Sequence, residues 1–330
     1  MKKARLIQRI LLGVMIALIV STAAVGVSAV SIIKRVFRDP GSAFADLPEQ
    51  TTVTVVDRNT GELVEKNVSV NNDVINILFI GRDNSAERDK KGQGYNTDVL
   101  VLAAIDMNKN TATLLSIPRD TKANIRLLDS DGHLRGTKTG KINSAFGNSG
   151  NIEKYGFQNT MASVSDLLDG TPIHGYVSIN MDGVGKMADL VGGVPITIDV
   201  DMSSVGMPKG SQQVLTGDKA LNYVRLRHLP GTDGSDLSRT KRQLRFMRAW
   251  LGQAKTISLT QVPTLYNESM KFVKTNLTLD QVVALASVLN RMDLDEDLNP
   301  ISMPYSGVQG GYVIPDETEL DKIIQQYFRK

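Results

Sequence analysis

The sequence predicts an α/β protein: one domain with a central, mainly antiparallel or mixed sheet flanked by helices, preceded by a single transmembrane helix. Three observations support this prediction. Residues 10–33 carry no charge, residues 76–117 contain three apolar strand-like segments, and helical and strand patterns alternate from residue 153 onward. The chain has 330 residues, of which 41% are hydrophobic, so its length allows one large domain or two ordinary ones. We expect residues 76–330 to form one domain.

The charge of the chain is unevenly distributed. It contains 38 Lys and Arg residues against 35 Asp and Glu residues, yet the first 38 residues hold seven basic side chains and no acidic one. Without those seven, 31 basic residues face 35 acidic ones, so residues 39–330 carry a net charge of −4. A globally basic, nucleic-acid-binding body is therefore excluded as the default. The absence of Cys excludes a disulfide framework, a thiolate metal site and a cysteine nucleophile.

The uncharged stretch at residues 10–33 is long enough to cross a membrane. As a helix with a rise of about 1.5 Å per residue it spans about 36 Å, whereas a bilayer core is about 30 Å thick. A cleavable signal peptide is the alternative, but its apolar region would be shorter, and Lys34, Arg35 and Arg38 follow where small residues would precede cleavage. Basic residues are slightly more numerous before the stretch than after it. We therefore expect a single-pass cell-membrane protein with residues 1–9 cytoplasmic and the domain extracytoplasmic.

Residues 34–75 are expected to form a juxtamembrane stalk that contains a short hairpin. Its strands are predicted at residues 51–56 and 62–70, around a turn at Gly61. We assign no chemistry to this segment.

The first three strands of the domain are predicted to place polar residues at one edge of the sheet. Strands at 77–80, 99–105 and 112–117 have short connections, which is typical of an antiparallel meander. The end of the first, the start of the second and the end of the third then meet. Asp83, Asp98, and Arg119 with Asp120 stand at those positions. Each could be a turn former or a local ion pair, but their convergence also fits a functional site.

Helices and strands alternate in the rest of the chain. Helices are predicted at residues 153–168, 182–191, 217–223, 237–254, 260–274, 279–291 and 317–328, and strands at 175–179, 195–200, 301–303 and 311–314.

A cluster of basic residues interrupts the acidic body. Seven basic residues stand against two acidic ones between Arg225 and Arg248. On the predicted helix, Arg239, Arg242 and Gln243 share a face, and like charges so placed cost about 0.2 to 0.5 kcal/mol. An anion between the two guanidinium groups would remove that cost. If the segment before the helix is extended, Arg225 and Arg227 point the same way and make a second fork.

This pattern indicates a phosphate or pyrophosphate site with a divalent metal. Arginine donates bidentately to phosphate oxygens and keeps its charge, and two carboxylates at a sheet edge would hold Mg²⁺. A solvated basic helix with surface ion pairs is the alternative. A nucleic-acid groove is disfavoured because no aromatic residues accompany the arginines.

Other catalytic patterns are absent from the sequence. His133, His174 and His228 have no metal-binding spacing, and the chain contains no Gly-x-Ser-x-Gly elbow, P-loop or Gly-x-Gly-x-x-Gly motif. His228 follows the Arg225 and Arg227 pair and could line the site, although an incidental position is the simpler interpretation.

At these residues the sequence resembles the LytR-CpsA-Psr family of membrane-anchored cell-envelope enzymes. The matching segments are 76–83 (NILFIGRD), 97–98 (TD), 115–121 (LSIPRDT), 141–145 (KINSA), 175–177 (GYV), 191–194 (VGGV), 217–221 (GDKAL), 223–227 (YVRLR) and 236–243 (DLSRTKRQ). The resemblance implies an extracytoplasmic domain of that family's α/β fold that holds a polyprenyl-pyrophosphate lipid in an apolar tunnel between sheet and helices. It also implies transfer of a phosphoglycopolymer, such as teichoic acid or capsule, onto a peptidoglycan sugar hydroxyl.

The resemblance also assigns roles by position. Asp83 and Asp98 correspond to ligands of Mg²⁺ or Mn²⁺. Pyrophosphate contacts are implied for Arg119, Arg225, Arg227, Arg239 and Gln243, with Arg82 and Lys141 as further candidates, and Arg119, Asp236 and Arg239 are the candidate catalytic residues. Asp236 would orient the arginines or help deprotonate the acceptor.

One position departs from the family pattern. Asn96 stands two residues before Asp98, where the family usually has Arg. A non-catalytic lipid-binding or regulatory protein of the envelope therefore stays open as an alternative. A polyprenyl-pyrophosphate pyrophosphatase, which gives the phosphoryl group to water, is a second alternative with the same chemistry.

Overall fold

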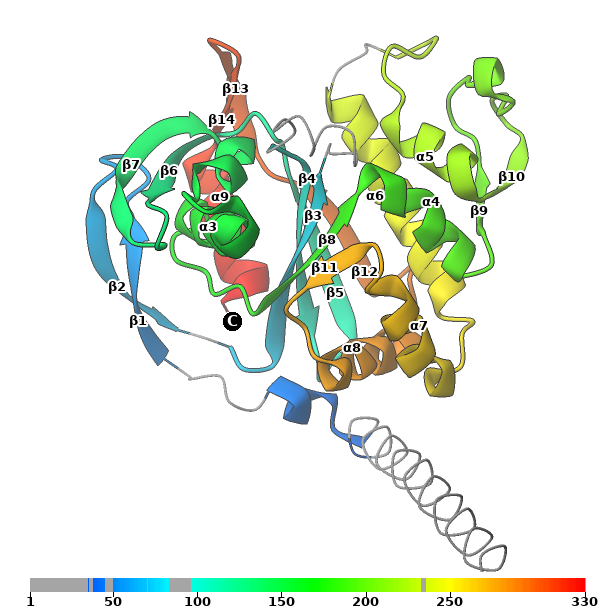
Figure 1. Cartoon of the computed structure of the whole chain (residues 1–330), viewed down its shortest axis with the longest axis horizontal. Coiled ribbons are helices and arrows are strands. Elements are labelled where there is room, and N and C mark those ends of the chain that lie inside the picture. Colours follow the sequence, from blue (N-terminus) through cyan, green and yellow to red (C-terminus); the bar gives the residue numbers. More distant parts are fainter. Residues whose placement is uncertain are drawn as a thin grey trace, which may run out of the picture.

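The structure is a computed structural model that describes residues 35, 38–44, 50–69, 71–82, 96–232 and 236–329 (Figure 1). The transmembrane helix predicted at residues 10–33 lies outside these ranges. Within them, no helix combines the length and the apolar character needed to cross a membrane.

A six-stranded sheet forms the centre of the molecule. Its strands, in spatial order, are β11 (Val273–Thr275), β8 (Gly175–Asn180), β3 (Val74–Arg82), β4 (Thr97–Asp106), β5 (Thr111–Ile117) and β12 (Leu298–Ser302). The predicted meander of β3, β4 and β5 is confirmed, because both pairs are antiparallel. β8 pairs in parallel with β3, and β12 with β5, so the sheet is mixed.

Both faces of this sheet are covered, which explains why its strands are apolar almost throughout. Leu78, Leu102 and Leu115 belong to a core shared with α3 (Ile152–Leu167) and α9 (Glu317–Ile323). Ile77, Ala103 and Leu114 lie on the opposite face, with α8 (Leu279–Arg291) and α6 (Asp236–Ala254). Figure 1 shows α3 and α9 on one side of the sheet and α6, α7 and α8 on the other.

The hairpin predicted in the stalk forms, as β1 (Gln50–Val56) and β2 (Leu63–Ser69), but it packs on the domain. Val55, Val56 and Val68 are buried. Asp166 on α3 accepts the backbone N–H of Val56 at 2.9 Å and two hydrogen bonds of 2.7 Å from Arg126. The hairpin is thus part of the packed body.

Arg126 belongs to a second hairpin, β6 (Lys122–Leu128) and β7 (Leu134–Lys141), which the sequence pattern does not predict. The polar composition of these strands hides their alternation. Within these two strands only the side chains of Ala123 and Ile125 are buried, beneath α3.

A third core lies beside the sheet. It is formed by α4 (Met181–Leu190), α5 (Gly217–Arg225), one side of α6, and the short strands β9 (Val194–Thr197) and β10 (Gln212–Leu215). Tyr223 is completely buried at its centre. Helix α4 approaches α5 closely at Gly185, where a Cβ would lie 2.6 Å from the carbonyl oxygen of Gly217.

The C-terminal part differs in detail from the prediction. The helix predicted at residues 260–274 is shorter, because α7 (Val262–Ser269) ends before β11. This short strand forms one edge of the sheet and pairs with β8. The predicted strand at residues 311–314 is β14 (Tyr312–Pro315), paired with β13 (Tyr305–Gln309). The predicted helix at residues 317–328 begins as α9 and ends in a π-helical turn, Ile324–Phe328.

Candidate functional site

The polar edge predicted from the meander exists. Arg82 at the end of β3 pairs with Thr97 at the start of β4, and Leu100 of β4 pairs with Ile117 at the end of β5. Arg82 also lies opposite Asn180, the last residue of β8. The ends of β3, β5 and β8 and the start of β4 therefore lie together at one edge of the sheet. Asp83, the first predicted metal ligand, lies outside the described residues.

Asp98 and Arg119 form the centre of this edge. Arg119 Nη1 donates to Asp98 Oδ1 at 2.6 Å, and the Asp98 side chain is only 6% exposed. The short distance and the burial make this a strong charge-assisted hydrogen bond. Pro118 ends β5 because it has no N–H to donate to the ladder, and so releases Arg119 toward the edge.

The row of charges continues through Asp120, which the sequence pattern placed at this edge beside Arg119. Its carboxylate lies 3.9 Å from Arg119 Nε and 2.9 Å from Lys141 Nζ. Two carboxylates and two cations thus alternate along the edge, in the order Asp98, Arg119, Asp120, Lys141. Each carboxylate thus lies next to a guanidinium or ammonium group, the types of group that also bind anions.

Main-chain hydrogen bonds hold these two segments together. The N–H of Ile142 donates to the carbonyl of Thr121 at 2.8 Å, and that of Asn143 to the carbonyl of Arg119 at 3.2 Å. Lys141 is the last residue of β7 and pairs with Lys122 of β6. The unpredicted hairpin is therefore what carries Lys141 to the site.

Arg82 is held by aromatic rings. Its guanidinium carbon lies 4.7 Å from the centre of the Phe146 ring and 5.7 Å from that of Phe157. Phe157 in turn stacks on Tyr176, with ring centres 4.5 Å apart. Such cation–π contacts orient a guanidinium without neutralising its charge.

Helix α6 runs from the site to the opposite end of the sheet. Arg248 forms an ion pair with Asp295, and Lys255 Nζ donates to the carbonyl of Met292, both beyond the end of α8. That region lies at the start of β5, since the N–H of Ala112 donates to the carbonyl of Asp297 at 2.8 Å. The helix has 19 residues and spans about 28 Å, and Figure 1 shows it running from that end of the sheet toward the end where β3 stops and β4 begins.

Two arginines near the start of α6 are buried. Arg239 is 4% exposed and Arg242 is also 4% exposed. The Arg242 guanidinium donates to the carbonyl oxygens of Tyr223, at 3.3 Å, and Leu226. The last carbonyls of α5 have no partner within their own helix, and Arg242 supplies one. The Arg242 guanidinium therefore caps the end of α5, and the anion expected between Arg239 and Arg242 stays a prediction.

Gln243 and the predicted Arg225–Arg227 fork also lie at the end of α5. Gln243 Nε2 donates to the carbonyl of Val224 at 3.3 Å, another contact with the end of α5. Arg225 is the last residue of α5, so the extended segment on which the predicted fork depends begins only after it, at Leu226. Both arginines are exposed, and no hydrogen bond or ion pair engages their side chains among the described residues.

Two further positions complete the placement of the predicted residues. Asp236 is the first residue of α6, and its side chain is not among those that the structure describes. Asn96 is exposed immediately before β4.

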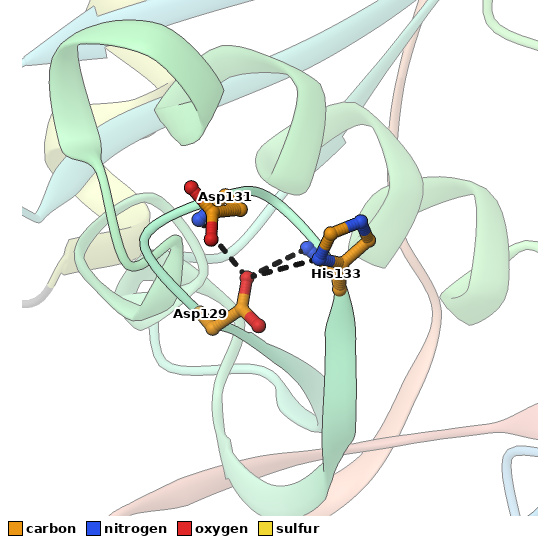
Figure 2. Close-up of side chains that lie close together, drawn as sticks. All are labelled: Asp129, Asp131 and His133. Atoms are coloured by element: carbon orange, nitrogen blue, oxygen red, sulfur yellow. Dashed lines mark hydrogen bonds and ion pairs between the residues drawn. The ribbon is translucent and has the colours of Figure 1, made fainter.

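Two of the His residues, His174 and His133, have structural roles. His174 Nδ1 accepts the backbone N–H of Asn76 at 2.7 Å, and burial lowers its pKa to about 4. His133 lies with Asp129 and Asp131 in the turn between β6 and β7 (Figure 2). Asp129 accepts the backbone N–H groups of the other two, at 2.9 and 3.0 Å, and these hydrogen bonds lower its pKa. The cluster is thus explained by turn formation.

Comparisons with known proteins agree with the resemblance seen in the sequence. The LytR_cpsA_psr family matches residues 46–329. Polyisoprenyl-teichoic acid–peptidoglycan teichoic acid transferase TagU of Bacillus cereus is 30% identical over 271 residues, covering 80% of this chain and 80% of TagU. The transferase of the same type named TagV, from Bacillus subtilis, is 27% identical over 279 residues, covering 80% of this chain and 66% of TagV.

The fold is also that of a solved relative. The crystal structure of Bacillus subtilis TagV matches with a TM-score of 0.62 and 26% identity, over 77% of this chain and 96% of that structure. The family match covers most of the chain, including the sheet edge and α6. The chain belongs to the LytR-CpsA-Psr family.

Proposed function

We propose that this protein is a glycopolymer phosphotransferase of the cell envelope. Its donor is a phosphoglycopolymer, such as teichoic acid, on a polyprenyl-pyrophosphate carrier, and its acceptor is a peptidoglycan sugar hydroxyl. The observation that carries the proposal is the ion pair between the buried Asp98 and Arg119 at the sheet edge, where Asp120 and Lys141 continue the row of alternating charges. The names of the curated relatives support the same reaction class.

The arrangement of charges suits a pyrophosphate group. Arg119 and Lys141 each pair with a carboxylate at the edge, while Arg225 and Arg227 are exposed cations at the end of α5 and just after it. Phosphoryl transfer needs little covalent help, because its transition state is stabilised mainly by positioning and by neutralising oxygen charge. Fixed guanidinium groups supply both.

The reaction forms one bond and breaks one. The acceptor hydroxyl oxygen attacks the phosphorus that carries the glycopolymer, and the bond from that phosphorus to the bridging oxygen breaks. Polyprenyl phosphate leaves with the bridging oxygen, and the hydroxyl proton passes to a carboxylate or to solvent. Asp236, at the start of α6, is the proposed base or positioning residue.

The donor groups at the edge fit a hard cation. Mg²⁺ binds oxygen ligands and takes one or two protein carboxylates together with substrate phosphates. Asp98 offers a buried carboxylate at the edge, and Asp83 follows β3. We propose these two as its ligands, with Mn²⁺ as a substitute. When bound, the ion would neutralise part of the pyrophosphate charge.

An apolar layer between sheet and helices suits the lipid chain. Several of its side chains are only partly buried, namely Phe79, Val99 and Val177 on the sheet and Leu244, Met247 and Leu251 on α6. Incompletely buried apolar groups gain free energy when an apolar chain covers them, at about 25 cal/mol per Å². We propose this layer as the binding site of the prenyl chain.

The location of the protein follows the same proposal. We propose that residues 10–33 anchor it in the cell membrane with the N-terminus inside and the domain outside. The described chain enters the domain at the end opposite the site, where the helical turn Pro40–Phe44 packs on α8.

The test uses the purified full chain in detergent with a labelled polyprenyl-pyrophosphate-linked glycopolymer. A transferase gives label on added peptidoglycan fragments, and that product requires Mg²⁺ and disappears with EDTA. A pyrophosphatase gives free phosphoglycopolymer whether or not the acceptor is present. Retained prenyl-phosphate binding without Mg²⁺-dependent turnover would refute the transferase and identify a binding protein.

A further inference from the structure

The hairpin β13–β14 projects from the edge of the sheet that holds the candidate site. Its two strands pair only with each other among the described sheets, and Gly310 and Gly311 form the turn with φ of 57° and 79°. Two successive residues with positive φ are typical of a tight two-residue hairpin turn, which glycine forms without strain. Figure 1 shows the hairpin standing out from the body.

The base of the hairpin is joined directly to the candidate site. The N–H of Val313 on β14 donates to the carbonyl of Asp120 at 2.9 Å, and Thr121 forms a bridge with Val313. The chain enters the hairpin from β12, where the N–H of Met303 donates to the carbonyl of Ser116 at 2.9 Å. The residue that adjoins Arg119 therefore also anchors the hairpin.

The composition of the hairpin is unusual for an exposed element. Residues 304–315 (PYSGVQGGYVIP) contain no charged side chain, although 22% of the chain is charged. Tyr305 is 43% exposed and Val308 is 65% exposed, and only two other large hydrophobic residues in the described chain are comparably exposed. Natural proteins usually protect projecting strands with charges, because bare strands associate with other molecules. An exposed apolar hairpin beside a site thus indicates a surface for binding.

The two exposed apolar side chains lie on one face. Tyr305 pairs with Pro315, and Val308 pairs with Val313. Val313 and Pro315 are two residues apart on one strand and so share a face, and paired residues point to the same side. A bulge between Tyr305 and Gly307 keeps Tyr305 on that face.

The chemistry of this face fits a neutral glycan chain. The faces of pyranose rings are apolar and stack on aromatic rings, while sugar hydroxyl and acetamido groups bond to polar side chains and free strand edges. An anionic polymer would call for cations, which the hairpin lacks. A membrane surface is disfavoured, because the described chain enters at the opposite end, where Arg35 pairs with Asp280 at the start of α8.

We propose that the face of the β13–β14 hairpin that carries Tyr305 and Val308 binds the acceptor glycan and guides its sugar hydroxyl toward the site at Arg119. This rests on the proposed function for the identity of the acceptor. The binding itself needs no donor, so it can be measured separately from transfer.

The test measures binding of the full chain in detergent to peptidoglycan sacculi stripped of anionic polymer, by co-sedimentation, and to an N-acetylglucosamine hexamer, by NMR titration. The variant Tyr305→Ala/Val308→Ser is expected to bind at least tenfold more weakly. Tyr305→Phe keeps the ring and is expected to bind like the wild type. Val214→Ser is the matched control, because Val214 is 57% exposed on β10, away from the hairpin. Circular dichroism establishes that each variant folds.

In the transfer assay, the double variant is expected to raise the acceptor KM at least tenfold and to change kcat less than twofold. Wild-type binding by the double variant would overturn the proposal, as would failure of the unmodified protein to bind either probe. A dimer that becomes a monomer in the double variant would also overturn it, because the face would then bind a second copy. None of these results bears on donor cleavage, which tests the proposed function.

Discussion

Removing the Arg119 side chain separates its structural contribution from its chemical one. In Arg119→Ala, the Asp98 carboxylate keeps its burial and loses the donor 2.6 Å away. Breaking a fully buried ion pair costs about 3–5 kcal/mol. The Arg119 side chain is 22% exposed and that of Asp98 6%, so water replaces part of the lost interaction. We expect a loss of about 2–3 kcal/mol of unfolding free energy, or roughly 5–10 °C in Tm.

Two further variants distinguish charge from geometry. Arg119→Ala/Asp98→Asn removes both charges and is expected to recover most of the lost stability, but no activity. Arg119→Lys keeps a cation beside Asp98 and is expected to stay within about 1 kcal/mol of the wild type, because only the second donor group is lost. Its transfer rate is nevertheless expected to fall by roughly 10²-fold, since a lysine cannot replace the bidentate fork at a phosphate.

The assay combines thermal unfolding with transfer kinetics on the same preparations. Trp250 is the single tryptophan, and its Nε1 donates to the carbonyl of Met187 at 2.9 Å, so its fluorescence reports unfolding of the region around α6. Wild-type transfer by Arg119→Lys would refute the role of the fork. An unchanged Tm in Arg119→Ala would refute the structural contribution of the buried pair.

Three other predictions concern residues outside the reaction. Arg242→Leu leaves the last carbonyls of α5 without a donor and is expected to lower the unfolding free energy by about 2–3 kcal/mol. A wild-type unfolding free energy would show that the capping of α5 by Arg242 is unimportant. Because burial lowers the pKa of His174 from 6.5 to about 4, the unfolded chain binds this proton first as the pH falls. The contribution of neutral His174 to the unfolding free energy is fully present above pH 6.5, and about 3 kcal/mol of it is lost by pH 4. In urea titrations at several pH values, His174→Gln should show a smaller decrease of the unfolding free energy between pH 6.5 and pH 4. A decrease equal to that of the wild type would contradict this prediction. Gly185→Ala is expected to destabilise the third core by about 1–3 kcal/mol, because its Cβ would meet the Gly217 carbonyl at 2.6 Å, and a wild-type Tm would show that α4 can shift.

Much of the fold could be predicted because its patterns are local. The apolar runs of β3, β4 and β5 and their short connections indicated a meander, and the meander placed Asp98 and Arg119 at one edge. The β6–β7 hairpin was missed because its strands are largely polar, and with it the route by which Lys141 reaches Asp120. The short strand β11 was read as helix because it is defined by its pairing with β8.

The partners of the side chains on α6 could not be predicted from sequence spacing. Sequence spacing alone placed Arg239, Arg242 and Gln243 on one face of a helix, and that placement holds for any α-helix. Which partner each side chain meets depends on the neighbouring helix. The end of α5 offers carbonyl groups to Arg242 and Gln243, so these two side chains contact the backbone.

The sequence by itself determined the β3–β5 meander, the order of the helices, the uneven charge and the family, because these depend on local periodicity and on residue types in order. Only the tertiary structure decided which charges meet. It paired Arg119 with Asp98, linked Asp120 to Lys141, and joined an uncharged hairpin to the same edge through the carbonyl of Asp120. The physical reason is that an ion pair or a hydrogen bond forms between groups a few ångströms apart in space, and residues separated by 21 to 193 positions come that close only in the folded chain.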